Sequence, residues 1–250
     1  MKHLYNYHLY EVMKYMGSKN KIAKNILPFI LKDRTPDQWY VEPFVGGCNM
    51  IDKVSGKRMG NDINFYLIEM WKALQRGWIP PELVTEDMYN DIRKNKDDYE
   101  PHLVAYVGFL FSFAAKWFGG YRRDVAGSKG DMENMKTQSR IALKSIMEQV
   151  PKIKDVIFSN LNYWEIPIPD NSIIYCDPPY GGTTKYKDNF DHPKFWEWVR
   201  KMSNSGHQVF VSEYNAPDDF ICIWEKDVKT TLSKQAGIVS REKLFVLNTE

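Results

Sequence analysis

Short apolar segments alternate with amphipathic helical segments at both ends of the chain, and this alternation restricts the fold more than any other feature. Strands are expected at 39–41, 58–61, 156–158, 173–176 and 208–211. Helices are expected at 18–31, 64–74 and 195–202, where apolar residues recur every three or four positions. Phe220–Trp224 and Lys243–Leu247 are expected to add an antiparallel pair. The alternation predicts an α/β fold, with a mainly parallel sheet covered by helices.

A helical block interrupts this alternation. Helical periodicity runs from Thr85 to Val150, with one polar, glycine-bearing break. We therefore expect residues 1–76 and 151–250 to build the sheet together, and residues 77–150 to form a helical insertion. In an open parallel sheet, ligands bind beyond the carboxyl ends of the strands, so the functional residues are expected there.

The bulk composition excludes several classes of protein. With 43% hydrophobic and 26% charged residues, the chain is typical of soluble globular proteins. Three cysteines without C-x-x-C spacing argue against a disulfide framework or a zinc site and favour a reducing cytosol. The N-terminus has no apolar signal-peptide core, and Leu103–Phe118 is too short and polar to span a membrane. We expect a cytoplasmic protein without a membrane anchor.

Positive charge is concentrated in two segments. Residues 1–34 hold seven Lys and Arg against two acidic residues, and residues 112–145 hold seven against three. The segment between them, 35–110, is acidic, with eight basic and twelve acidic residues. Two basic segments can build a phosphate-binding face, although solvated surface charge explains the same counts equally well.

The tetrapeptide Asp177-Pro178-Pro179-Tyr180 is the most specific chemical signal, and it directly follows the apolar strand Ile173–Cys176. Two consecutive prolines fix the backbone and remove two N–H donors, which leaves a rigid turn with outward carbonyls. A carboxylate and a neighbouring carbonyl can accept both hydrogens of one amino group, and an aromatic ring can stack on a planar base. A structural turn is the other interpretation, but all four residues together favour a functional one.

The tetrapeptide resembles the catalytic motif of amino-group methyltransferases, and three more segments are similar to the Dam-like DNA adenine methyltransferases. These segments are Lys14–Lys19, Val41–Gly47 and Asn61–Asn64. Their order, with the insertion before the tetrapeptide, is similar to the alpha group of that family. The resemblance implies a Rossmann-like class I methyltransferase sheet with a helical target-recognition insertion. It also implies methyl transfer from S-adenosylmethionine to N6 of adenine in double-stranded DNA, with no obligate protein partner.

The resemblance assigns residues to the site. The catalytic residues would be Asp177, Pro178, Pro179 and Tyr180. The cofactor would be held by Tyr15, Met16, Gly17, Lys19, Glu42, Pro43, Phe44, Gly46, Gly47, Asp62, Ile63, Asn162 and Asp177. No metal ligand is implied.

Simple physical arguments support several of these assignments. Gly46 and Gly47 allow a ligand to approach the backbone closely, and the spacing is not that of a dinucleotide-binding loop. Asp62 stands where ribose-binding acids follow the second strand in related sheets, although a surface turn would explain it alone. Lys19, near a helix start, is suited to a cofactor carboxylate or is simply solvated.

Two positions depart from the family pattern. Cys48 replaces the last glycine of the usual F-x-G-x-G, so the helix expected after it would sit slightly further from the sheet. Asn162 stands where the family usually has an acid, and its amide oxygen can accept a hydrogen bond without charge.

Contacts to DNA are expected mainly from the insertion. Phe111–Asp124 runs from a buried helix through a glycine turn into two arginines, and it resembles the place where the family's recognition hairpin begins. Arginine reads guanine bidentately and also binds phosphate, and a mobile surface loop is an equally good interpretation for any one residue. The expected DNA-binding residues are Lys14, Tyr121, Arg122, Arg123, Lys129 and Arg140, with Tyr121 to Arg123 pointing outward.

The expected chemistry begins with extrusion of the adenine, because N6 is paired inside a duplex. Asp177 and the Pro178 carbonyl would then hold N6, and no metal or strong base is required. An RNA or protein amino-group methyltransferase remains an alternative, although the 130 positions from Gly47 to Asp177 favour a DNA enzyme. A catalytically silent DNA-binding protein is the other alternative, and the intact tetrapeptide argues against it.

Overall fold

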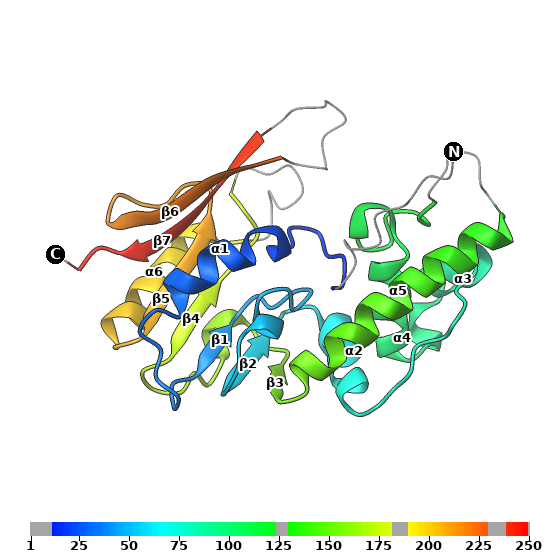
Figure 1. Ribbon diagram of the computed structural model, residues 1–250, viewed down its shortest axis with the longest axis horizontal. Coiled ribbons are helices and arrows are strands. Elements are labelled where there is room, and N and C mark those ends of the chain that lie inside the picture. Colours follow the sequence, from blue (N-terminus) through cyan, green and yellow to red (C-terminus); the bar gives the residue numbers. More distant parts are fainter. Residues whose placement is uncertain (1–11, 124–129, 182–189, 230–238, 250) are drawn as a thin grey trace.

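The computed structural model describes residues 12–123, 130–181, 190–229 and 239–249 of the chain. They form one seven-stranded sheet in the order β3-β2-β1-β4-β5-β7-β6 (Figure 1). The strands are β1 (Tyr40–Glu42), β2 (Arg58–Asn61), β3 (Val156–Ser159), β4 (Ile173–Cys176), β5 (Gln208–Glu213), β6 (Phe220–Lys229) and β7 (Val239–Leu247). The first five are parallel, and β7 runs antiparallel to both β5 and β6. The expected α/β fold is confirmed.

Alternate residues of the central strands face opposite layers, as the two-residue period of a strand requires. Ile173 and Tyr175 of β4 belong to one hydrophobic cluster, which includes α1 (Asn20–Ile30) and α2 (Phe65–Gln75). Ile174 and Cys176 belong to a second cluster on the other face, packed against α6 (His192–Asn204). Helices therefore cover both faces of the sheet, which leaves the strand ends as the accessible edge.

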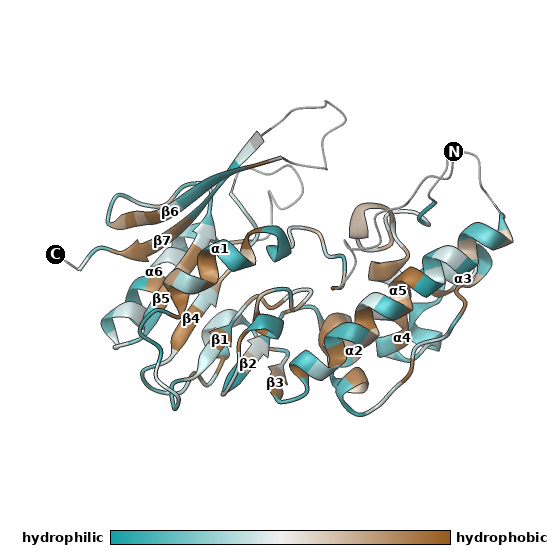
Figure 2. Ribbon diagram, viewed as in Figure 1, coloured by the Kyte–Doolittle hydropathy of each residue, from teal (hydrophilic) through white to brown (hydrophobic). Residues whose placement is uncertain are grey.

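The insertion consists of α3 (Glu86–Lys94), α4 (Pro101–Leu110) and α5 (Met132–Ile153). It packs on α2, and Tyr106 and Ile146 lie in the same hydrophobic cluster as Ile173. Figure 2 shows hydrophobic stretches of α2, α4 and α5 meeting beside the sheet. The insertion therefore extends the core of the sheet and has no separate one among the described residues.

Several details differ from the sequence-based expectations. Instead of the α-helix expected after the glycine turn, the chain forms a single 3-10 turn, η2 (Ile51–Lys53). Cys48 has a left-handed φ of 56°, which turns the chain and prevents a regular helix from starting there. The expected boundary at residue 150 falls inside the last turn of α5. The apolar segment from Leu103 ends its helix at Leu110, and no helix among the described residues is long and apolar enough to cross a membrane.

Candidate active site

The tetrapeptide Asp177–Tyr180 lies at the carboxyl end of β4, in the middle of the sheet. The order of strands explains its position, because the chain builds β1, β2 and β3 outward and then returns beside β1 to form β4. The carboxyl ends of β1 and β4 are thus adjacent at the point where the strand order reverses, which is where open α/β sheets bind ligands. Pro178 is buried, and no described residue donates a hydrogen bond to its carbonyl oxygen.

Lys19 connects the N-terminal motif to this turn. Its Nζ lies 2.9 Å from Asp177 Oδ1, 3.7 Å from Glu242 Oε2 and 3.1 Å from the Gly17 carbonyl oxygen. The same ammonium lies 4.5 Å from the centroid of the Tyr180 ring, and the residue is only 7% exposed. The two motifs, which the sequence separates widely, therefore form one cluster.

The electrostatics of the cluster are dominated by burial and by this ion pair. Burial raises the pKa of Asp177, and the Lys19 ammonium offsets part of that rise. Burial by itself would lower the pKa of Lys19, but the carboxylates of Asp177 and Glu242 outweigh it, so that the pKa lies above its usual value. Lys19 is therefore charged at neutral pH although it is buried.

A third carboxylate fixes the backbone after the tetrapeptide. Glu213, the last residue of β5, accepts hydrogen bonds from the backbone N–H groups of Gly181 (3.1 Å) and Tyr214 (2.7 Å). Burial raises the pKa of Glu213 to about 7, although both N–H groups oppose the shift. The Tyr214 ring packs edge-on against Tyr180, with ring centroids 4.6 Å apart.

The glycine loop lies against Tyr15 of the N-terminal motif. Gly46 has a φ of 48°, and a Cβ there would lie 2.8 Å from the Tyr15 ring; one at Gly47 would lie 2.6 Å from Tyr15 Cβ. Only glycine permits this approach. Trp71 Nε1, from α2, donates a hydrogen bond to the Gly46 carbonyl oxygen (3.0 Å). Gln149 Nε2, from α5, donates one to the Gly47 carbonyl oxygen (2.9 Å), so both helices hold the loop in place.

The acid after β2 also contacts this loop. Asp62 accepts hydrogen bonds from the backbone N–H of Gly46 at Oδ2 (3.0 Å) and from that of Asn64 at Oδ1 (2.9 Å). A carboxylate has about four acceptor positions, so each oxygen retains one for a further donor. Ile63 beside it is 67% exposed and offers an apolar surface at the same edge of the sheet.

The remaining expected cofactor residues are arranged less uniformly. Glu42 is buried and accepts a hydrogen bond from Tyr40 Oη (2.9 Å), and burial raises its pKa well above the usual value. The Pro43 carbonyl accepts from Asn61, and the Phe44 ring packs against three other aromatic rings. Met16 and Gly17 form the turn before Lys19. The Asn162 amide already donates to Glu165 Oε2 (2.8 Å) and forms a capping box for the next turn.

The expected DNA-binding residues differ in their exposure. Lys14 and Arg140 are exposed, and Lys129 lies outside the described residues. The expectation that Tyr121 points outward is wrong, because it is 7% exposed and its hydroxyl donates to the Val84 carbonyl (2.9 Å) within the insertion. Arg123 is also turned inward, since its guanidinium forms an ion pair with Glu86.

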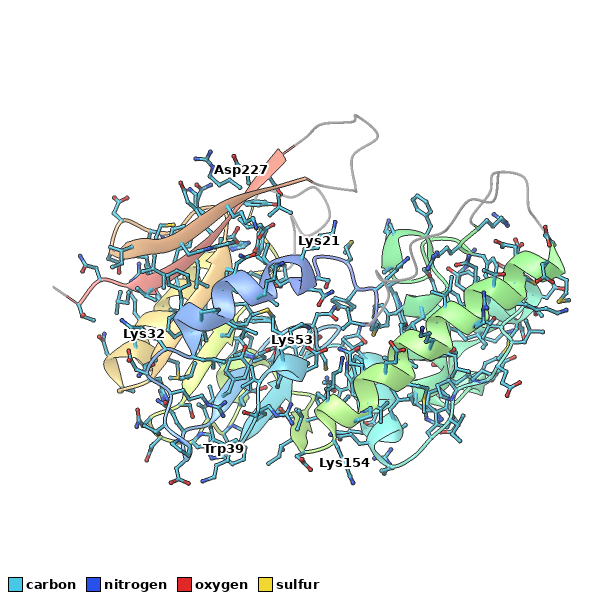
Figure 3. All side chains as sticks on the ribbon, viewed as in Figure 1. Lys21, Lys32, Trp39, Lys53, Lys154 and Asp227 are labelled. Carbon is cyan, nitrogen blue, oxygen red and sulfur yellow. The ribbon has the colours of Figure 1, made fainter. Side chains whose placement is uncertain are left out.

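Basic side chains also lie outside the insertion. Figure 3 labels Lys21 on α1 and Lys53 on η2, which lie between the sheet and the insertion in that view. Both side chains belong to exposed residues. Lys21 belongs to the basic N-terminal segment, and Lys53 forms an ion pair with Asp52 (2.7 Å).

Five residues of the site are absent from the sequence-based assignment: Trp71, Gln149, Glu213, Tyr214 and Glu242. Glu213 and Tyr214 stand close after the apolar strand expected at 208–211, separated from it only by Ser212, and this signal is similar to the one that identified Asp177. Glu242 lies inside an antiparallel strand, where the sequence gives no such signal. It contacts Lys19 and Tyr180, which are both distant along the chain.

The chain is similar to known methyltransferases. Residues 15–246 match the family model for the D12 class N6 adenine-specific DNA methyltransferases. The chain is 22% identical over 227 residues to the Type II methyltransferase M.FokI of Planomicrobium okeanokoites, a match that covers 80% of this chain. The chain spans only 34% of the length of M.FokI.

Two solved structures give weaker matches. SMU.472 complexed with SAH has a TM-score of 0.38 and 12% identity, covering 95% of this chain and 54% of that one. The methylase HI0767 of Haemophilus influenzae has a TM-score of 0.35 and 11% identity, covering 93% and 99%. The family assignment rests instead on the match over residues 15–246, a range that includes the glycine loop, Asp62 and the tetrapeptide. The chain belongs to the D12 class N6 adenine-specific DNA methyltransferase family.

Proposed function

We propose that this protein transfers a methyl group from S-adenosylmethionine to N6 of adenine in double-stranded DNA. The observation that carries the proposal is the turn at Asp177. It places the Asp177 carboxylate next to the Pro178 carbonyl, which accepts no hydrogen bond from a described residue, at the strand ends that also carry the glycine loop. Family membership supports the choice of adenine in DNA. The helical insertion, residues 77–150, would contribute to target recognition, and the rest of the chain would carry the cofactor and catalytic residues.

The residues at the sheet edge fit S-adenosylmethionine. Gly46 and Gly47 leave room at the loop backbone that a Cβ would fill, and Asp62 retains acceptor positions for ribose hydroxyls. The exposed side chain of Ile63 would cover an adenine ring, and the resemblance also assigns Phe44 and Asn162 to the cofactor. The cofactor supplies an electrophilic methyl group on a sulfonium ion.

The chain's own residues would hold the target base. Asp177 and the Pro178 carbonyl accept the two N6 hydrogens, which withdraws the nitrogen lone pair from conjugation with the ring and directs it outward. Tyr180 stacks on the extruded base, and this recovers part of the few kcal/mol that base flipping costs. N6 would take the methyl group as the methyl–sulfur bond breaks and a neutral thioether leaves, and the methylated nitrogen would then release a proton to solvent. Because no strong base is required, orientation and fixed dipoles would provide most of the rate enhancement.

Contacts with the DNA backbone would come from the basic side chains. Lys14 and Arg140 are exposed, and Arg122 adjoins the glycine turn of the insertion. Lys129 is included on its sequence position alone. Such contacts bind phosphates irrespective of sequence and weaken with salt.

Substitution of Asp177 tests the proposal. We expect Asp177→Ala to lose methyl transfer by several orders of magnitude, and Asp177→Asn to lose less, because the amide keeps one acceptor. The measurement is incorporation of labelled methyl groups into random-sequence DNA, followed by identification of the methylated base. Asp33→Ala, at an exposed aspartate after α1, is the matched control.

Two results would contradict the proposal. Near-normal turnover of Asp177→Ala on DNA would remove the proposed role of the turn. If the unsubstituted chain methylates RNA or protein but not DNA, the proposed substrate is wrong, although the proposed chemistry of the turn could still hold.

A further inference from the structure

Glu242 reaches the catalytic turn from a strand outside the parallel part of the sheet. Because β7 is antiparallel, residues near its start lie at the edge where β4 and β5 end. The Glu242 side chain is 14% exposed, and its Oε2 accepts a hydrogen bond from Tyr180 Oη (2.9 Å). The same oxygen lies 3.7 Å from Lys19 Nζ.

Lys19 occupies positions that the target base would need. Its ammonium is paired with Asp177 Oδ1 and lies over one face of the Tyr180 ring, the two groups that hold the amino group and the ring of adenine. When the base enters, the ammonium has to give up at least part of its contact with Asp177. A buried ammonium without a counter-ion is costly, and Glu242 is the other carboxylate to which the structure pairs it.

We propose that Glu242 is a positioning residue for methyl transfer, which orients the Tyr180 ring and receives the Lys19 ammonium when the target amino group binds Asp177. The proposal rests on the adenine methylation proposed above. Glu242 acts through Tyr180 and Lys19 and does not touch N6 itself.

The charges around Asp177 give the proposal a distinctive signature. Asp177 faces Lys19 from the N-terminal motif, Glu242 from β7 and Glu213 from β5, with Tyr180 on its own turn; Tyr175 and Glu42 lie deeper. The Glu242 carboxylate raises the pKa of both Asp177 and Lys19. Loss of that charge therefore lowers the pKa of Asp177. Because Asp177 acts as a carboxylate, the acid limb of the pH profile of kcat/KM then moves to lower pH.

Glu242→Gln separates the two contacts, because the amide oxygen still accepts from Tyr180 Oη while the charge is lost. We expect kcat/KM for DNA to fall about tenfold or more, as for a hydrogen-bonded ion pair that loses one charge. The acid limb should move to lower pH, and melting temperature and cofactor affinity should change little. Glu225→Gln, on the neighbouring strand β6 and exposed, is the matched control.

Two further variants test the contact with Tyr180. Tyr180→Phe removes only the hydroxyl, and Glu242→Ala removes its acceptor, so the double variant should lose less than the product of the single losses. Extrusion of the base is followed without methyl transfer by the fluorescence of 2-aminopurine at the target position, which should be weaker in Glu242→Ala.

The outcomes are distinguishable. If the unsubstituted protein does not methylate adenine in DNA, the proposed function is wrong and this inference falls with it. If it does, and Glu242→Gln retains its kcat/KM and its acid limb within error of Glu225→Gln, only the role of Glu242 is overturned. Independent losses in Tyr180→Phe and Glu242→Ala would equally overturn the orienting role.

Discussion

Three carboxylates and one ammonium meet at the Asp177–Tyr180 turn. Asp177, Glu213 and Glu242 surround Lys19, so the cluster has more negative than positive charge when all are ionised. Excess negative charge in a buried site favours a cationic ligand and a nitrogen that becomes positive as it is methylated. At the scale of single residues, the site is therefore suited to transfer from a sulfonium ion to an amine.

The unusual pKa of Glu213 leads to a prediction about stability. Its folded-state pKa of about 7 lies above the usual 4.5, so its contribution to stability is full below pH 4.5 and is lost as the pH rises through 7. Relative to the unsubstituted protein, Glu213→Gln should gain up to about 3 kcal/mol between pH 5 and pH 8. Urea unfolding at both pH values measures this difference. An equal difference at the two pH values would show that Glu213 does not titrate in this range.

The sequence identified the part of the site whose residues are adjacent in the chain. Asp177 and Gly46 follow apolar strands, so the pattern of strands predicts both their existence and their common edge. The Lys19–Asp177 ion pair was not predicted, because it depends on how closely the N-terminal motif approaches β4. Periodicity contains no information about such distances.

Among the elements, the glycine loop shows how local sequence and distant packing combine. Its glycines were predictable, but it is held by Trp71 from α2 and Gln149 from α5, and Gln149 lies 102 residues away from Gly47. A glutamine among the apolar residues of α5 gave no signal. Cys48 adopts a left-handed conformation, which costs a cysteine about 1–2 kcal/mol and explains why no α-helix begins there.

The loop between α4 and α5 leads to a prediction about target reading. Arg122 and Arg123 both make contacts within the described structure, and that of Arg123 is an ion pair with Glu86 that would have to break before it could bind a base, so we expect base reading from Arg122. Arg122→Ala should lose about 1–3 kcal/mol of discrimination at one position of the site. Arg123→Ala should instead weaken the binding of all DNA sequences to a similar degree. Methylation of a site library, compared position by position, measures both. Unchanged base preferences in Arg122→Ala would mean that this loop positions DNA without reading it.

At the scale of the whole molecule, the sheet and the insertion share one hydrophobic core. α5 runs from the insertion to β3 and contributes Gln149 to the glycine loop, so the expected two-part organisation is joined by a continuous helix. The alternation of strands and helices predicted the parallel strands correctly. It did not predict that β7 lies between β5 and β6, because pairing of distant strands is decided by tertiary contacts, and Glu242 was missed for the same reason.

The shared core predicts that the molecule unfolds in one cooperative transition and that the cofactor stabilises all of it. A ligand that binds only the folded state, at 100 times its Kd, adds about 2.7 kcal/mol. For a chain of this size, that corresponds to a rise of about 5–10 °C in Tm. Calorimetry with S-adenosylmethionine in EDTA should show a single shifted transition, and Asp62→Ala should reduce the shift at the same cofactor concentration. Two transitions, of which only one responds to the cofactor, would show that the insertion and the sheet fold independently in spite of their common core. Dependence of the shift on added metal would contradict the metal-free site.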